Sequence, residues 1–92
     1  MSDALFVVTY EYVDDVLERR APLREAHLAL LRDAHAAGEA TMAGAVGDPV
    51  TGALFVFRSR EAAERFVIAD PYGEGGLVVR HRIQPWTLVV GA

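Results

Sequence analysis

A histidine and an aspartate far apart in the chain carry the most distinctive chemistry in this sequence. One stripe with helical spacing contains an imidazole among apolar side chains: Leu23, His27, Leu30 and Ala34. An imidazole on a buried face needs a polar partner, because an unpaired buried polar group is costly. Asp70, directly before Pro71, is the best candidate. We therefore predict that the fold brings His27 and Asp70 together.

Such a pair can act as a proton-transfer device. The carboxylate orients the ring and fixes its tautomer, so that the other ring nitrogen can serve as a general base or acid. The same two residues can instead form a buried structural hydrogen bond between two helices. Asp70 can also simply turn the chain before Pro71. Taken alone, these residues favour the structural interpretation.

Three further residues are candidates for substrate binding. Arg24 lies one helical turn before His27, where it either holds an anionic substrate group or is a solvated surface charge. Tyr10 and Tyr72 either line a substrate pocket or pack as aromatic residues of the core. Each assignment is left open at this point.

The other two histidines are not expected to be catalytic. His35 is expected at the surface near a helix C-terminus, and His81 is expected to be buried or at an interface. The three histidines lack the spacing of a metal site, and there is no cysteine. The glycine-rich segment 73–76 is not a phosphate loop, and no flavin motif is present. We therefore predict neither a metal nor another cofactor.

Four strands and two helices are expected to position these residues. The predicted strands are Ala4–Tyr12 and residues 39–46, 53–57 and 77–83. The first helix should start at Val16 or at Pro22 and end near Ala37; in the first case Pro22 marks a break. The second helix should run from a Ser59 cap to Asp70. Residues 73–76 are expected to form a loop at the rim of the His27–Asp70 site. Pro85 should interrupt the last strand, with residues 86–90 as a tail or an extra edge strand.

This order predicts an α+β fold of the ferredoxin-like type, β-α-β-β-α-β. Two helices would cover one face of a four-stranded antiparallel sheet. The helix-free face is expected to be partly apolar through Phe6, Val8 and Tyr10. A second copy would cover it in a two-fold homodimer of the dimeric α/β-barrel kind.

Composition limits the class of protein. A chain of 92 residues is expected to form one domain over residues 1–92, and its 52% hydrophobic content suits a subunit with an apolar interface. The net charge of −4 and the dispersed basic residues argue against nucleic-acid binding. No segment approaches the ~20 apolar residues of a membrane span. The expected location is the cytoplasm.

Several short motifs occur in a characteristic order along the chain: Arg24-x-x-His27-Leu28, Ala43-Gly44, Gly52-Ala53-Leu54, Asp70-Pro71-Tyr72, Gly76-Leu77-Val78 and Ile83-x-Pro85-Trp86. Together they resemble the YCII-related (YciI-like) family. The resemblance implies a ferredoxin-like fold, usually dimeric, with His27 and Asp70 as an active-site pair. It also matches Arg24 to an arginine that is frequent in the family's helix. The chain departs from the family pattern at Ala45, where many members have proline, and at His81, where an apolar residue is usual.

Two functions of different class follow. The resemblance favours a small cofactor-free enzyme, a lyase, an isomerase or a dehydrochlorinase like those of the family that act on chlorinated hydroquinones. His27 would remove a proton from a small cyclic or aromatic substrate, with Asp70 as its partner and Arg24 stabilising negative charge. The alternative is a non-catalytic small-molecule binding or interaction domain with a structural His27–Asp70 pair. A third hypothesis is an oxygenase of the dimeric α/β-barrel kind, which the lack of a metal or flavin motif disfavours.

Overall fold

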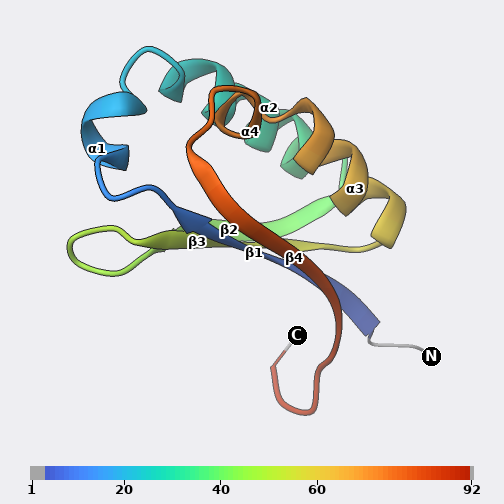
Figure 1. The fold of residues 1–92 in the computed structure, drawn as a ribbon. Helices are drawn as coiled ribbons and strands as arrows, with labels where there is room; N and C mark the ends of the chain where they lie inside the picture. The colour runs from blue at the N-terminus through green and yellow to red at the C-terminus, as the bar shows by residue number, and fades with distance from the viewer. Residues whose placement is uncertain (1–3, 92) are drawn as a thin grey trace.

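The computed structural model describes residues 4–91 and shows one sheet with all helices on the same side (Figure 1). The elements in chain order are β1 (Ala4–Tyr12), α1 (Val16–Arg19), α2 (Arg24–Ala36), β2 (Ala40–Val46), β3 (Gly52–Phe57), α3 (Arg60–Ala69), α4 (Pro71–Glu74) and β4 (Val78–Thr87). The strand order is β2-β3-β1-β4, and every neighbouring pair is antiparallel. The predicted α+β ferredoxin-like fold is therefore confirmed.

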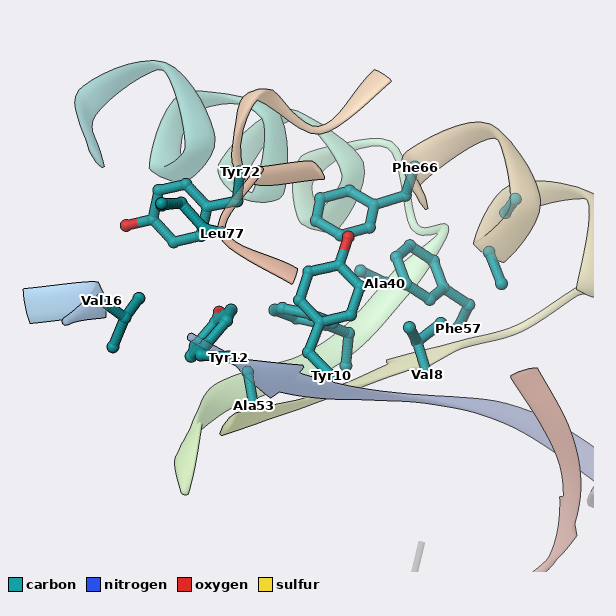
Figure 2. Close-up of a cluster of buried hydrophobic side chains, with 13 residues drawn as sticks. Val8, Tyr10, Tyr12, Val16, Ala40, Ala53, Phe57, Phe66, Tyr72 and Leu77 are labelled. Atoms are coloured by element: carbon teal, nitrogen blue, oxygen red, sulfur yellow. The ribbon is translucent and has the colours of Figure 1, made fainter. Parts of the chain in front are cut away.

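The core lies between the sheet and the helices. Alternate residues of β1 point into it, and Val8, Tyr10 and Tyr12 are all buried there. Figure 2 shows Tyr10 rising from β1 towards Phe66 of α3. The prediction that Val8 and Tyr10 belong to the helix-free face is therefore wrong. Both faces of β1 begin with apolar residues, so alternation alone cannot tell which of them the helices cover.

The helix-free face of the sheet is apolar in part, as predicted. It carries a shallow groove of about 660 Å³ between β2, β3, β1 and β4. Large apolar side chains are exposed on it: Met42, Val46, Leu54 and Trp86. This groove is on the side of the sheet opposite to His27, because Val7 and Thr9 line it while Val8 and Tyr10 point the other way.

The first helical region is broken, as one of the two predicted alternatives required. α1 ends at Arg19, a turn follows, and α2 begins at Arg24 after Pro22. The segment predicted as a loop after Asp70 differs in part, because Pro71–Glu74 forms the single helical turn α4. Proline at the first position of a helical turn is tolerated, since its missing N–H has no intrahelical acceptor there.

β4 continues through Pro85, which corrects the predicted interruption. The strand runs to Thr87, and Pro85 lies opposite Phe6 of β1. β4 is an edge strand, so the missing N–H of proline costs no hydrogen bond on its outer side. His81 lies in this strand and is exposed, which corrects the expectation that it is buried within the chain. His35 is exposed as predicted, and its Nδ1 donates to the Ala40 carbonyl at 2.9 Å.

Candidate functional site

Asp70 sits at the junction of two helices, where the chain leaves α3 and enters α4. Its backbone is extended, as expected for a residue before proline, and this stops α3. The Asp70 side chain then caps α4 by accepting the Tyr72 N–H at 3.1 Å through Oδ1. The residue is completely buried, at 0% exposure. The carboxylate is thus fixed by local chain geometry before any contact with distant residues is counted.

Two distant side chains complete the hydrogen bonds of this carboxylate. His27 contacts Asp70 Oδ1 through Nδ1 at 2.7 Å, and the Tyr10 hydroxyl donates to Oδ2 at 2.8 Å. The predicted contact between His27 and Asp70 is therefore confirmed. Sequence reasoning missed that Tyr10 also bonds Asp70, because it assigned Tyr10 to the helix-free face of the sheet.

The hydrogen bond fixes the tautomer of His27. An ionised carboxylate only accepts, so Nδ1 must carry the proton and, in the neutral ring, Nε2 carries the lone pair. His27 is 5% exposed. Its Nε2 makes no hydrogen bond to residues 4–91 and is not one of their fully enclosed polar atoms without a partner, so it keeps a small contact with solvent. The free nitrogen therefore lies at the edge of the site, with the carboxylate behind the ring.

Tyr72 covers one face of the His27 ring. The two rings are parallel within 3°, and their centroids are 3.7 Å apart. The Tyr72 hydroxyl is fully buried and has no hydrogen-bond partner among the described residues 4–91. In Figure 2 this hydroxyl points away from Phe66, towards the side where Val16 of α1 lies.

Burial raises the pKa of three tyrosines around the carboxylate: Tyr10, Tyr12 and Tyr72. The negative charge of Asp70 raises each of these pKa values further. The guanidinium groups of Arg20 and Arg24 act in the opposite direction on Tyr12 and Tyr72. The positive charges of Arg20 and Arg24 therefore favour the ionised form of both hydroxyls. Arg24 was predicted near the site, whereas nothing in the sequence pattern indicated Arg20 or Tyr12.

Within residues 4–91, no cluster of three or more His, Cys, Asp or Glu has a geometry that could hold a metal ion. Over the same range, none of the helices has the length and apolar character needed to cross a bilayer.

Comparison with known proteins gives consistent matches over nearly the whole chain. The family model of the YCII-related domain matches residues 4–87. Protein YciI of Escherichia coli is 33% identical over 96 residues, which cover 92% of this chain and 98% of that protein. Protein YciI of Shigella flexneri matches with the same identity and coverage.

Two solved structures share the fold. The 5-chloro-2-hydroxyhydroquinone dehydrochlorinase of Burkholderia phenoliruptrix, solved with 2,5-dihydroxybenzoquinone, has a TM-score of 0.74 at 24% identity. That match covers 90% of this chain and 93% of the other. A candidate antibiotic biosynthesis monooxygenase of Nitrosomonas europaea has a TM-score of 0.55 at 11% identity, over 97% and 93% of the two chains.

Proposed function

Because the chain belongs to the YCII-related family, we propose that it is a cofactor-free enzyme in which His27 transfers a proton to or from a small cyclic substrate. The observation that carries this proposal is the orientation of His27. Asp70 holds Nδ1 at 2.7 Å, which leaves the lone pair of the neutral ring on Nε2 at the solvent edge. A neutral imidazole with a fixed tautomer is suited to act as a general base.

Asp70 and Tyr10 act through His27. When His27 gains a proton, the positive ring is stabilised by the carboxylate that already contacts Nδ1. The Tyr10 hydroxyl holds the other carboxylate oxygen and is buried with it, so it has no route to a substrate. In place of the predicted substrate contact, we assign Tyr10 a positioning role.

The proposed reaction class is isomerisation or elimination. In both, His27 Nε2 takes a proton from a ring hydroxyl or from a carbon next to a carbonyl. Isomerisation returns the proton at another position, whereas elimination expels a leaving group such as chloride with its bonding electrons. Neither consumes an oxidant or a reductant. The dehydrochlorinase with the same fold supports this choice. Tyr72, which stacks on the His27 ring, and Arg24, one turn before His27 on α2, are the proposed substrate contacts.

A second candidate function follows from the burial of the pair. Asp70 is 0% and His27 is 5% exposed, which is also what a structural hydrogen bond between α2 and the α3–α4 junction would give. In that case the chain would be a non-catalytic small-molecule binding or interaction domain. The two functions differ in whether a ligand reaches Nε2.

We also propose that the chain forms a homodimer through the helix-free face of its sheet. The groove of about 660 Å³ and the exposed Met42, Leu54 and Trp86 would then be covered by the same surface of a second copy. Exposed apolar patches of this kind mark interaction sites, and two-fold dimers are the commonest oligomers. His27 lies on the other side of the sheet, so this contact leaves Nε2 free.

The test is chloride release from 5-chloro-2-hydroxyhydroquinone, the compound in the name of the structural neighbour. We expect turnover by the wild type. The control variant Arg32→Gln removes an exposed charge further along α2 and should also turn over the substrate. His27→Gln keeps a polar side chain but loses the base, so we expect at least a ~100-fold lower rate. Equal rates for wild type and His27→Gln would rule out His27 as the base. For substrates that are isomerised and release no chloride, the exchange of a substrate C–H hydrogen for deuterium from the solvent compares the wild type with His27→Gln in the same way.

A further inference from the structure

The helix-free face of the sheet carries a charged cluster beside its apolar groove. Glu11 of β1 and Arg80 and Arg82 of β4 are exposed, and with Thr9 and His81 they line a shallow pocket of about 200 Å³. Arg82 lies opposite Thr9 in the strand pair, and Arg80 lies opposite Glu11. Residues directly opposite each other point to the same face of a sheet. Because Thr9 also lines the groove, the charged cluster of Glu11, Arg80 and Arg82 borders the groove on the same face.

The three charges of this cluster are unpaired in the single chain. Glu11 and Arg80 are direct cross-strand neighbours, yet no ion pair within residues 4–91 includes either of them or Arg82. Exposed charges of this kind contribute little to stability, because water solvates them well. Their role therefore depends on whether another molecule covers this face of the sheet.

A second copy on the helix-free face would have to cover the charged cluster as well as the groove. The four strands, about 4.8 Å apart and about 20–30 Å long, make a face of roughly 400–600 Å². A stable interface takes about 800 Å² from each partner, so the whole face is needed and the groove alone is too small. A charge that is buried without a counter-charge is costly. The molecule that covers this face must therefore bring charges opposite to those of the cluster.

A second copy of this chain carries charges of both signs in the same patch. In a two-fold interface that patch occurs on both subunits, so a contact from residue i to residue j is repeated from j to i. We infer that Glu11 of each copy forms an ion pair with Arg82 of the partner subunit, which gives two reciprocal ion pairs. Arg82 is nearer the centre of the face than Arg80, because it lies opposite the groove-lining Thr9. This inference rests on the proposed homodimer and names the contacts that select its partner.

The test is charge reversal at the two positions, measured by sedimentation equilibrium. Glu11→Arg brings positive charges together across the interface, and Arg82→Glu brings negative charges together. At a concentration at which the wild type sediments at about twice the subunit mass of 10.0 kDa, each variant alone should sediment at the subunit mass. Glu64→Arg, the matched control, reverses an exposed acid of α3 on the other side of the sheet and should remain a dimer.

An equal mixture of the two variants tests the pairing itself. In a mixed dimer each substituted position faces the opposite charge again. The mixture should therefore sediment at twice the subunit mass, although neither variant does so alone. Rescue by mixing would also show that both variants are folded. Glu11→Gln removes the charge without adding repulsion, and it should raise the dissociation constant of the dimer at least ~10-fold.

Three results would overturn the reciprocal ion pairs while the wild type remains a dimer. They are a charge-reversed variant that dimerises like the wild type, a mixture of folded variants that stays at the subunit mass, and an unchanged dissociation constant for Glu11→Gln. The proposed homodimer would then stand without these contacts. A wild type that sediments as a single subunit would overturn the homodimer and this inference together. Neither outcome bears on the proposed role of His27, which lies on the other side of the sheet.

Discussion

The ring of Tyr72 lies flat against the ring of His27, with centroids 3.7 Å apart and planes within 3°. The hydrogen bond to Asp70 fixes the imidazole in its own plane, and this stack fixes it from one face. Within the part of the chain that the structure describes, Nε2 is then the ring nitrogen of His27 without a hydrogen-bond partner. Local backbone geometry at Asp70 and Tyr72 therefore sets the direction in which His27 can exchange a proton.

Removal of the Tyr10 hydroxyl should destabilise the fold. Tyr10→Phe keeps the ring in the core but takes a donor from the buried Asp70 carboxylate. Hydrogen bonds to charged groups contribute about 1.5–3 kcal/mol, and we expect a loss in that range by urea unfolding. Tyr12→Phe is the control, because the Tyr12 hydroxyl makes no hydrogen bond in the described chain, and its unfolding free energy should change little. An equal loss in both variants would mean that the Asp70 contact is not responsible.

The free energy of unfolding should fall at alkaline pH because three tyrosines near Asp70 are buried. Burial raises the pKa of Tyr10, Tyr12 and Tyr72 above the ordinary value of 10.0. Above about pH 10 the unfolded chain loses these protons and the folded chain keeps them, so the unfolding free energy should drop by about 1.4 kcal/mol per pH unit for each tyrosine. Their contribution is complete below pH 10 and is lost above it.

This titration is unusually clean in the present chain, since the sequence contains no lysine. The measurement is urea unfolding between neutral pH and strong alkali, together with the ultraviolet absorbance of tyrosinate. Absorbance should appear only as the protein unfolds. Tyrosinate formation near pH 10 in a chain that stays folded would show that the hydroxyls are solvated.

Gly52 should tolerate no side chain. A Cβ atom there would collide with the backbone carbonyl oxygen of Tyr10, because β3 passes close to β1 at this point. Neither backbone can move without disturbing the strand pair, so Gly52→Ala should cost more than about 2 kcal/mol. Gly44→Ala is the control, since open space surrounds that position. Thermal melts compare the two, and similar melting temperatures would refute the close approach.

A charge in the groove of the helix-free face should separate the proposed dimer. Leu54 lines this groove and is exposed in the single chain, so Leu54→Glu would bury a carboxylate in the interface. We expect the wild type to sediment at about twice the subunit mass of 10.0 kDa and the variant at the subunit mass. Ile68→Glu changes an exposed apolar residue of α3 outside the groove and should leave the dimer intact. A wild type that sediments as a single subunit would refute the interface.

The sequence predicts the elements of this fold better than their faces. Hydrophobic periodicity locates the strands and both long helices, and Pro71 locates the end of α3. It does not decide which side of β1 faces the helices, because Phe6 and Val8 on one side are matched by Leu5 and Val7 on the other. The sequence wrongly predicts that Pro85 interrupts the last strand, because the order of the strands, which places β4 at the edge of the sheet, cannot be seen in the local sequence.

The residues of the site likewise divide into those that local sequence signals predict and those that only the assembled fold reveals. His27 and Asp70 can be predicted, because an imidazole in an apolar stripe and an aspartate before proline are local signals. Arg20 and Tyr12 cannot, because their relation to Tyr72 exists only after α1, β1 and α4 are assembled. Tyr10 belongs with them: alternation puts it on the same face of β1 as Val8, but neither the burial of that face under the helices nor the bond to Asp70 follows from the sequence.

The proposal that His27 is a base is tested most directly by nitrogen NMR of the histidine rings. At neutral pH we expect His27 to carry its proton on Nδ1 and a lone pair on Nε2, and we expect 2,5-dihydroxybenzoquinone to shift the Nε2 resonance. His35, which is exposed on the far end of α2, serves as the internal control. An Nε2-protonated ring, or an Nε2 resonance that stays unchanged while the quinone binds, would contradict the proposal.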